Sequence, residues 1–191
     1  MNRARVRHLV LAALALLTLP ALADDFSDIQ QLMKAGQPAQ ALARTEQAIT
    51  TTPRDARLRF LKGVLLADLG RRSEAVQAYT ELTQDFPELP EPYNNLAALY
   101  AATGDYDKAR AALESAVRAN PGYGTAYENL GDVYLRLAAQ AYTRAQQLGP
   151  DGTGAGAKLA QVRQLFGPAR PAVPAAAPAA PAASSASAAA R

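Results

Sequence analysis

Residues 93–121 read YNNLAALYAATGDYDKARAALESAVRANP, and this stretch decides the fold. Its first part spaces apolar side chains three and four residues apart, which is the pattern of an amphipathic helix. Its second part repeats that spacing after a short interruption. The apolar positions of the first helix are Tyr93, Leu96, Ala97 and Tyr100, and those of the second are Ala109, Ala112, Leu113 and Ala116. The stretch therefore predicts two helices in succession.

Three residues mark the boundaries of these two helices. Gly104 is predicted to end the first helix, because glycine adopts the left-handed conformation without a steric penalty. Asp105 can cap the N-terminus of the second helix with its side chain. Pro121 ends the unit, since proline has no amide hydrogen to donate inside a helix. The unit is therefore predicted to be a helical hairpin with a tight turn.

The same unit recurs at an interval of 34 residues. Glycine, alanine and proline return at this interval in three sets: Gly36, Gly70 and Gly104; Ala41, Ala75 and Ala109; Pro53, Pro87 and Pro121. Small residues recur likewise at Gly63, Ala97 and Gly131, where they should let the paired helices approach closely. A fixed period of this size indicates a supersecondary unit that stacks on copies of itself, because one copy cannot bury its apolar face alone. The sequence thus predicts an all-α solenoid.

The hairpin resembles the tetratricopeptide repeat (TPR). Residues 93–100 (YNNLAALY) and 127–134 (YENLGDVY) both fit the family's first-helix pattern of aromatic, x, x, Leu, Gly, x, x, Tyr. The second half of the pattern is matched by Ala109, Leu113, Ala116 and Pro121. The resemblance covers roughly residues 24–150. It implies a right-handed helical-hairpin solenoid of about three and a half repeats.

Counting back from the prolines places the repeats at 22–55, 56–89 and 90–123, with a fourth repeat ending near 152. The first repeat is the most divergent, because it has no aromatic residue at the first signature position. It also begins inside the N-terminal leader described below. We therefore expect the solenoid to occupy residues 24–152.

The fourth repeat departs from the pattern. If its second-helix signature residues keep their usual positions, about five residues that should form the turn are missing. These signature residues are Tyr142, Ala145 and Pro150. No glycine or proline interrupts residues 133–147, and the apolar stripe continues without a change of phase. We predict one continuous helix over roughly residues 125–148.

A final short helix is predicted near residues 157–166, within a segment 153–167 that follows the solenoid. Leu159, Val162 and Phe166 lie on one side of this helix. They would cover apolar surface that a fifth repeat would otherwise bury. The segment is therefore expected to cap the solenoid.

The first 23 residues have the features of a secretory signal peptide. Three arginines precede an apolar run from Leu9 to Leu19, and the small-residue site 21–23 (ALA) precedes Asp24. The apolar run is too short to span a membrane comfortably, although an uncleaved membrane anchor is the alternative. Lipid attachment through cysteine is excluded, because the chain contains none. The leader looks bacterial, and we expect export by the general secretory route to the periplasm.

Residues 168–191 consist almost wholly of alanine, proline and serine. Such a segment cannot bury a core, and its prolines forbid a long helix. We expect a disordered, partly extended tail. It is interpreted as a spacer or an extension without a role, and a docking motif for a proline-recognising partner is the alternative.

Composition excludes several kinds of chemistry. The only histidine is His8, in the leader, and the chain has no cysteine. Ordinary zinc, haem and copper sites and the Ser-His-Asp or Cys-His nucleophiles therefore lack their side chains. We expect no metal, no cofactor and no catalytic site. The one enzymatic alternative uses Glu128 and Asp132, four residues apart on one helix face, as a general acid and base.

Charge argues against nucleic acid as a partner. The chain has 20 basic and 17 acidic residues, and three of the basic residues lie in the leader. The part after the leader is therefore close to neutral. Neither nucleic acid nor an anionic membrane surface has an electrostatic reason to bind it.

The resemblance implies that partners bind the exposed side of the first helices, which lines a concave groove in this family. The residues predicted for this groove are Phe26, Gln30, Met33, Arg57, Phe60, Val64, Glu91, Asn94, Asn95, Ala98, Glu128, Asn129 and Asp132. An extended peptide could place its apolar part near Phe26 and Phe60. A basic residue of the peptide could then lie near Glu128 and Asp132. The alternative is that both phenylalanines only pack against neighbouring helices.

The sequence thus predicts an adaptor or scaffold that binds a protein or peptide in its groove, acting in envelope assembly, secretion or folding. A self-associating structural protein is the alternative, in which the convex face or the long last helix docks on a second copy. Stable membrane insertion after cleavage of the leader is not expected. The residues identify neither the partner nor its pathway.

Overall fold

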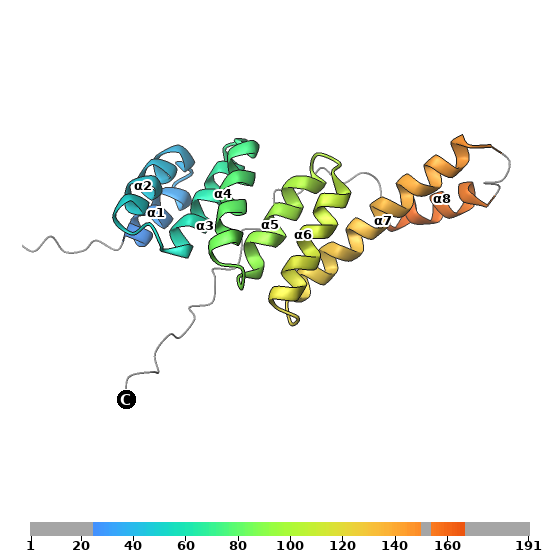
Figure 1. The fold of residues 1–191 in the computed structure, drawn as a ribbon. Coiled ribbons are helices and arrows are strands. Elements are labelled where there is room, and N and C mark those ends of the chain that lie inside the picture. The colour runs from blue at the N-terminus through green and yellow to red at the C-terminus, as the bar shows by residue number, and fades with distance from the viewer. Residues whose placement is uncertain (1–24, 150–153, 167–191) are drawn as a thin grey trace, which may run out of the picture.

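A computed structural model describes residues 25–149 and 154–166 of the chain. Eight helices and no strand occur in these two ranges (Figure 1). Six of the helices form three hairpins, and the remaining two are a long helix and a short one. Their bounds are α1 Asp25–Lys34, α2 Pro38–Thr51, α3 Ala56–Asp68, α4 Arg72–Asp85, α5 Pro90–Ala101, α6 Tyr106–Ala119, α7 Gly124–Gln147 and α8 Ala155–Leu165. The prediction of an all-α hairpin solenoid is confirmed.

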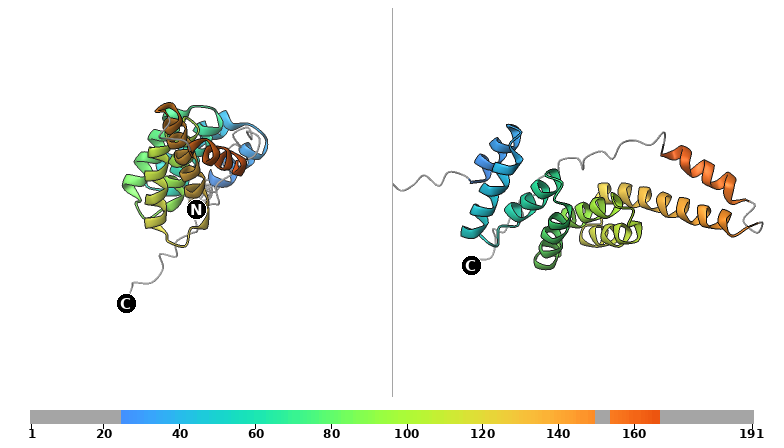
Figure 2. Two further views of the ribbon diagram at one scale, coloured as in Figure 1. Left: turned by 90° about the vertical axis from the view of Figure 1, so that its right-hand side faces the viewer. Right: turned by 90° about the horizontal axis from the view of Figure 1, so that it is seen from above.

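The helices stack in the order of the sequence. Each helix packs mainly on the helices just before and after it, and α5 also contacts α7 (Figures 1 and 2). The result is an elongated row of hairpins rather than a ball. This arrangement follows from the repeat, because each hairpin buries its apolar face only against its neighbours.

The turns of the three hairpins share one geometry. Gly36, Gly70 and Gly104 have φ values of 69°, 73° and 80°, so each adopts the left-handed conformation that was predicted for Gly104. The amide of the residue after each glycine donates to a carbonyl five residues earlier, with N···O distances between 2.9 and 3.0 Å. These bonds satisfy carbonyl groups that a helix end leaves free. The local sequence therefore sets the turn.

The predicted side-chain cap at Asp105 is wrong. Asp105 occupies the N-cap position of α6, but its side chain accepts no hydrogen bond from the helix backbone. Its carboxylate instead binds the ammonium group of Lys108, at 2.7 Å. The corresponding residue of α3 behaves as a cap, because Asp55 accepts hydrogen bonds from the amides of Arg57 and Leu58.

The core runs along the solenoid between the paired helices. Ala41, Ala75 and Ala109, one from each second helix, have no exposed surface. The ring of Tyr79 lies against Gly63, where an added Cβ atom would lie 2.5 Å from the ring. The expected close approach at a small residue is thus confirmed at Gly63. It is not found at Gly131, where an added Cβ atom would meet nothing within 4 Å.

The fourth repeat is a single helix, as predicted. α7 is 24 residues long and has no break, and α8 runs antiparallel along its second half. Ala155 and Leu159 are buried, and Phe166 at the end of α8 lies against Arg136 of α7. The predicted final helix is present as α8, and it packs on α7. The predicted leader and tail, residues 1–23 and 168–191, lie outside the described residues.

A search of the described helices for a long apolar segment found none that could cross a membrane.

Candidate binding groove

A groove lies between α5 and α7 and is floored by α6. Its volume is about 460 Å³. The wall from α5 consists of alanines, and the opposite wall from α7 carries polar and charged side chains. The lining residues are Ala97, Ala98, Ala101, Ala102, Tyr106, Leu113, Asn129, Asp132, Val133, Arg136 and Phe166. Because the residues of the α5 wall are all alanines, no long side chain narrows the groove from that side.

A pair of amide side chains closes one end of the groove. The Nδ2 atom of Asn129 donates to the Oδ1 atom of Asn94 at 2.7 Å. Both residues are half-buried, and the bond joins helices that are two apart in the sequence. Buried amides that are fixed in this way keep further donor and acceptor positions for a ligand backbone. Asn94 and Asn129 were both predicted as groove residues.

A charged and aromatic cluster lies at the other end. Asp132 and Arg136 are one turn apart on α7, and the guanidinium carbon of Arg136 lies 3.9 Å from the ring centroid of Phe166. At this distance a guanidinium is attracted to the face of the ring. The groove therefore offers one carboxylate, one cation and one aromatic face within a short length.

Arg136 and Phe166 were not predicted as groove residues. Arg136 follows Asp132 by four residues, so its place on the groove side of α7 could have been found from helical spacing. Phe166 was predicted only as part of the cap. Its position at the groove depends on α8 turning back along α7, which no local pattern indicates.

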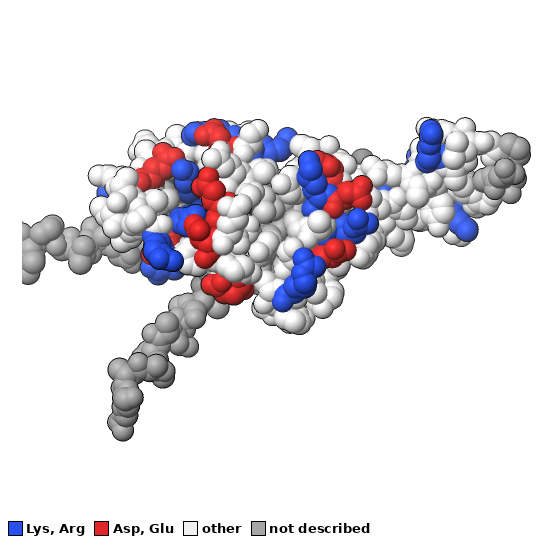
Figure 3. All heavy atoms as spheres, viewed as in Figure 1, with Lys and Arg blue, Asp and Glu red and all other residues white. Residues whose placement is uncertain are grey.

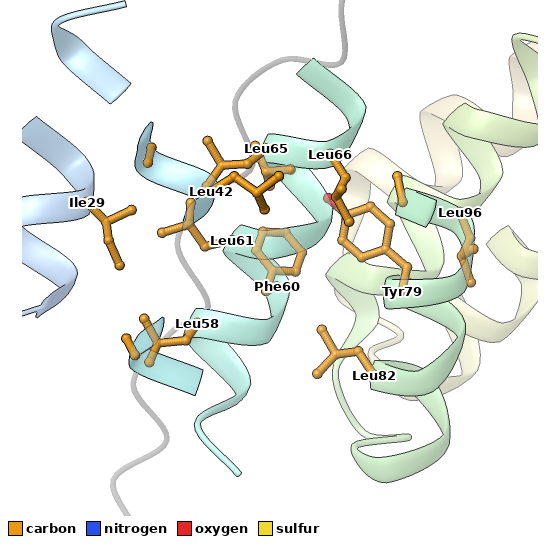
Figure 4. Close-up of a cluster of buried hydrophobic side chains, with 14 residues drawn as sticks. Ile29, Leu42, Leu58, Phe60, Leu61, Leu65, Leu66, Tyr79, Leu82 and Leu96 are labelled. Carbon is orange, nitrogen blue, oxygen red and sulfur yellow. The ribbon is translucent and has the colours of Figure 1, made fainter. Parts of the chain in front are cut away.

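The assignment of Phe60, Val64 and Asn95 to an exposed groove is wrong. Their side chains are buried, with 4%, 8% and 8% of their surface exposed. Helix α3 packs on both α2 and α4, so its apolar residues point into the core on several sides (Figure 4). The ring of Phe60 packs against that of Tyr79, with centroids 5.6 Å apart.

Asn95 has a structural role in the same core. Its Nδ2 atom donates to the hydroxyl oxygen of Tyr79 at 3.0 Å, which satisfies two buried polar groups. Burial raises the pKa of Tyr79 well above its usual range, so this hydroxyl stays neutral. The phenol and the amide therefore hold α4 and α5 together.

The predicted residues of the first repeat do not line the groove between α5 and α7. Phe26 and Met33 are half-buried against the N-terminal core, and Gln30 is exposed. The guanidinium carbon of Arg57 lies 5.5 Å from the ring centroid of Phe26. These side chains form a separate surface near α1 and α3, which leaves their predicted binding role untested.

Glu91 and Glu128 also lie outside the groove lining. One carboxylate oxygen of Glu91, Oε2, is buried and accepts no hydrogen bond from any residue that the structure describes. Burial first, and then the charge of Glu91, raise the pKa of Tyr123. Glu128 is exposed on the first turns of α7. Of the two acids considered as a catalytic pair, only Asp132 faces the groove.

No group of three or more potential metal ligands was found among residues 25–149 and 154–166.

Family models agree with the repeat. Two models described as tetratricopeptide repeat match the chain, one over residues 29–90 and the other over residues 66–132. Together they span residues 29–132, which is more than half of the 191 residues. The matched region includes the first hairpins and the first turns of α7. It ends before α8.

Solved structures share the fold. YrrB, described as a TPR protein with an unusual peptide-binding site, is 26% identical with a TM-score of 0.51. That match covers 55% of this chain and 54% of YrrB, so it spans about half of that protein. TTC0263, a thermophilic TPR protein of Thermus thermophilus, is 23% identical over 75% of this chain and 82% of its own, with a TM-score of 0.55. MamA 41-end from Desulfovibrio magneticus RS-1 is 20% identical over 75% and 96%, with a TM-score of 0.54.

Proposed function

The chain belongs to the tetratricopeptide repeat family, whose members mediate protein–protein interactions, and from this premise we propose that it is an adaptor that binds an extended peptide segment between α5 and α7. The bound segment belongs to another protein of the cell envelope. By holding that protein, the adaptor serves envelope assembly, secretion or folding in the periplasm.

The observation that carries this proposal is the chemistry of the groove. The alanine wall of α5 admits a polypeptide backbone, and the amides of Asn94 and Asn129 can bond its carbonyl and amide groups. Asp132 favours a basic residue of the peptide. Interfaces concentrate their binding energy in a few such anchors. YrrB, which is described as having an unusual peptide-binding site, supports a peptide as the class of ligand.

The proposed location follows from residues 1–23. A basic start, an apolar run and a small-residue site before Asp24 are the features of a cleaved secretory signal. N-terminal sequencing of the protein in a periplasmic fraction should find Asp24 first. A chain that begins at Met1 in a membrane fraction would contradict the proposed location without affecting the groove.

The groove is tested by filling it. Ala98→Trp places a large ring in the groove from a half-buried position on α5. Ala111→Trp is the matched control, because Ala111 is exposed on α6 and does not line the groove. The immobilised chain is incubated with periplasmic extract, and captured proteins are identified by mass spectrometry. Synthetic peptides that tile a captured protein are then titrated against both variants.

We expect one peptide to bind the parent chain and the Ala111→Trp variant alike, and to bind the Ala98→Trp variant at least about tenfold more weakly. Circular dichroism must first show that both variants are folded. Equal binding by the two variants would place the site elsewhere. If the Ala98→Trp variant still binds the peptide and the Ala111→Trp variant does not, the binding site lies on the exposed side of α6.

A further inference from the structure

The first half of α7 corresponds to the first helix of a hairpin, but no second helix within the described residues covers its apolar face. In the α5–α6 hairpin, α6 covers that face. In α5 the equivalent signature positions lie under α6, so that Tyr93 and Tyr100 are half-buried and Ala97 is 2% exposed. In α7 the same positions are open. Tyr127 is 50% exposed, Tyr134 is 48% exposed, and Gly131 between them is exposed as well. Figure 3 shows few charged side chains at the α7–α8 end on the side in view.

The second half of α7 carries the residues of the missing second helix. Its signature residues follow those of α6 by 29 residues instead of 34: Ala138, Tyr142 and Ala145 correspond to Ala109, Leu113 and Ala116. Between the two signatures the third repeat has residues 101–108, whereas the fourth has only residues 135–137. The whole turn is therefore absent, and the two halves continue as one straight helix.

The two halves of α7 carry residues that would pack on each other in a hairpin. They cannot contact each other within one chain. In the second hairpin, Tyr79 fills the space above Gly63. The equivalent residues of the fourth repeat are Tyr142 and Gly131. They are 11 residues apart on one helix, about 16 Å at 1.5 Å per residue, and no atom lies within 4 Å of a Cβ added at Gly131. Eleven residues are about three turns, so both lie on the same side of α7.

We propose that this face of α7 binds α7 of a second copy of the chain, with the two helices antiparallel. Gly131 of each copy then receives Tyr142 of the partner subunit, as Gly63 receives Tyr79 within one chain. A two-fold axis passes near the middle of α7 and makes the contact self-complementary. The dimer restores between chains the hairpin that the lost turn removed from each chain, which is the relation found in domain swapping.

Charge supports a second copy as the occupant. Glu128 is exposed three residues before Gly131, on the same side of α7, and Lys158 of α8 is exposed beside Tyr142. Pairing each Gly131 with Tyr142 of the partner subunit therefore brings Glu128 of one copy near Lys158 of the partner subunit, and opposite charges favour this contact.

Helix α8 leaves this pairing possible. It covers the second half of α7 on one side, where the ammonium of Lys158 lies 5.9 Å from the ring centroid of Tyr142. Ala138, Tyr142 and Ala145 remain only half-buried under this cover. In the dimer α8 keeps its place, since it packs on α7 as the first helix of a following repeat would.

The test is sedimentation velocity of the purified chain over a range of micromolar concentrations. We expect a reversible dimer. Gly131→Leu should weaken the dimer at least about tenfold, because it fills the position that Tyr142 of the partner subunit occupies. A Cβ atom added at Gly131 meets nothing within 4 Å in the single chain, and circular dichroism must show that the variant is folded. Ala111→Leu, at an exposed position of α6, is the matched control and should leave the dimer unchanged.

A second variant restores the missing turn. Residues 135–137 (LRL) are replaced by AATGDYDK, the sequence of residues 101–108. The fourth repeat can then close on itself, and we expect a folded monomer with unchanged helix content. A parent chain that is monomeric throughout, or a dimer that Gly131→Leu leaves intact, would overturn the proposal. So would a dimer that persists at full strength after the turn is restored.

Discussion

The hairpin α5–α6 and the long helix α7 are built from nearly the same signature residues and differ in one short segment. Four residues, 102–105, separate α5 from α6, and they let the chain reverse so that Tyr93 and Tyr100 pack under α6. In α7 there is no such turn, and Tyr127 and Tyr134 remain about half exposed. An apolar stripe therefore does not by itself secure burial. Whether it is buried depends on a connection that can bring a second helix to it.

The largest expected difference in folding stability is between a core aromatic residue and an exposed aromatic residue of α7. Phe60→Ala removes a ring that is 4% exposed and packed on Tyr79, and it should lower the free energy of unfolding by about 3–5 kcal/mol. Tyr134→Ala removes a ring that is 48% exposed and should cost less than about 1 kcal/mol in the single chain. Urea unfolding at low protein concentration measures both. Equal losses would mean that the two aromatic positions are equivalent after all.

The next prediction compares the change in folding stability caused by alanine at Gly63 and at Gly131. Gly63→Ala places a methyl group within 2.5 Å of the Tyr79 ring and should cost about 1–3 kcal/mol through overpacking. Gly131→Ala meets nothing within 4 Å and should stabilise α7 by up to about 1 kcal/mol, because alanine favours the helix. The test is whether the two substitutions change the folding stability in opposite directions. The urea midpoints of the two variants measure this. A loss at Gly131 as large as that at Gly63 would show that a helix already covers this face within the chain.

A smaller loss of folding stability is expected from a substitution in the turn between α5 and α6. Gly104 has a φ of 80° and free space around it, so Gly104→Val acts through the backbone alone. We expect a loss of about 1–2 kcal/mol, since a side chain disfavours the left-handed conformation. Pro174→Ala, outside the described residues, is the control and should leave the melting curve unchanged. Identical melting curves for Gly104→Val and the parent would refute the proposed register of the turn.

The smallest effect compares two aspartates at helix starts. Asp55→Ala removes hydrogen bonds to two backbone amides of α3 and should cost about 1 kcal/mol. Asp105→Ala removes only a side-chain contact with Lys108 and should leave the thermal midpoint unchanged. Thermal unfolding by circular dichroism separates them. A larger loss at Asp105 would mean that its side chain caps α6 in solution.

Part of the candidate site could be predicted from helical spacing. The repeat register placed Asn94, Ala98, Asn129 and Asp132 on the groove side of their helices. Ala98, Asn129 and Asp132 line the groove between α5 and α7, and Asn94 is hydrogen-bonded to Asn129. Phe60 and Val64 were placed by the same register and are buried instead. The register gives the direction of a side chain around its own helix. It does not state how closely the neighbouring helices approach on that side.

The features that follow from the amino-acid sequence alone are local. The left-handed conformation at Gly36, Gly70 and Gly104 follows from the lack of a Cβ atom, and the continuity of α7 follows from the absence of any breaker between residues 133 and 147. The tertiary structure alone decided which residues meet across long separations. Phe166 reaches Arg136 because α8 turns back along α7, and Tyr134 remains exposed because no helix of the described chain covers it. Burial is a property of several packed elements together, so no single stretch of sequence contains it.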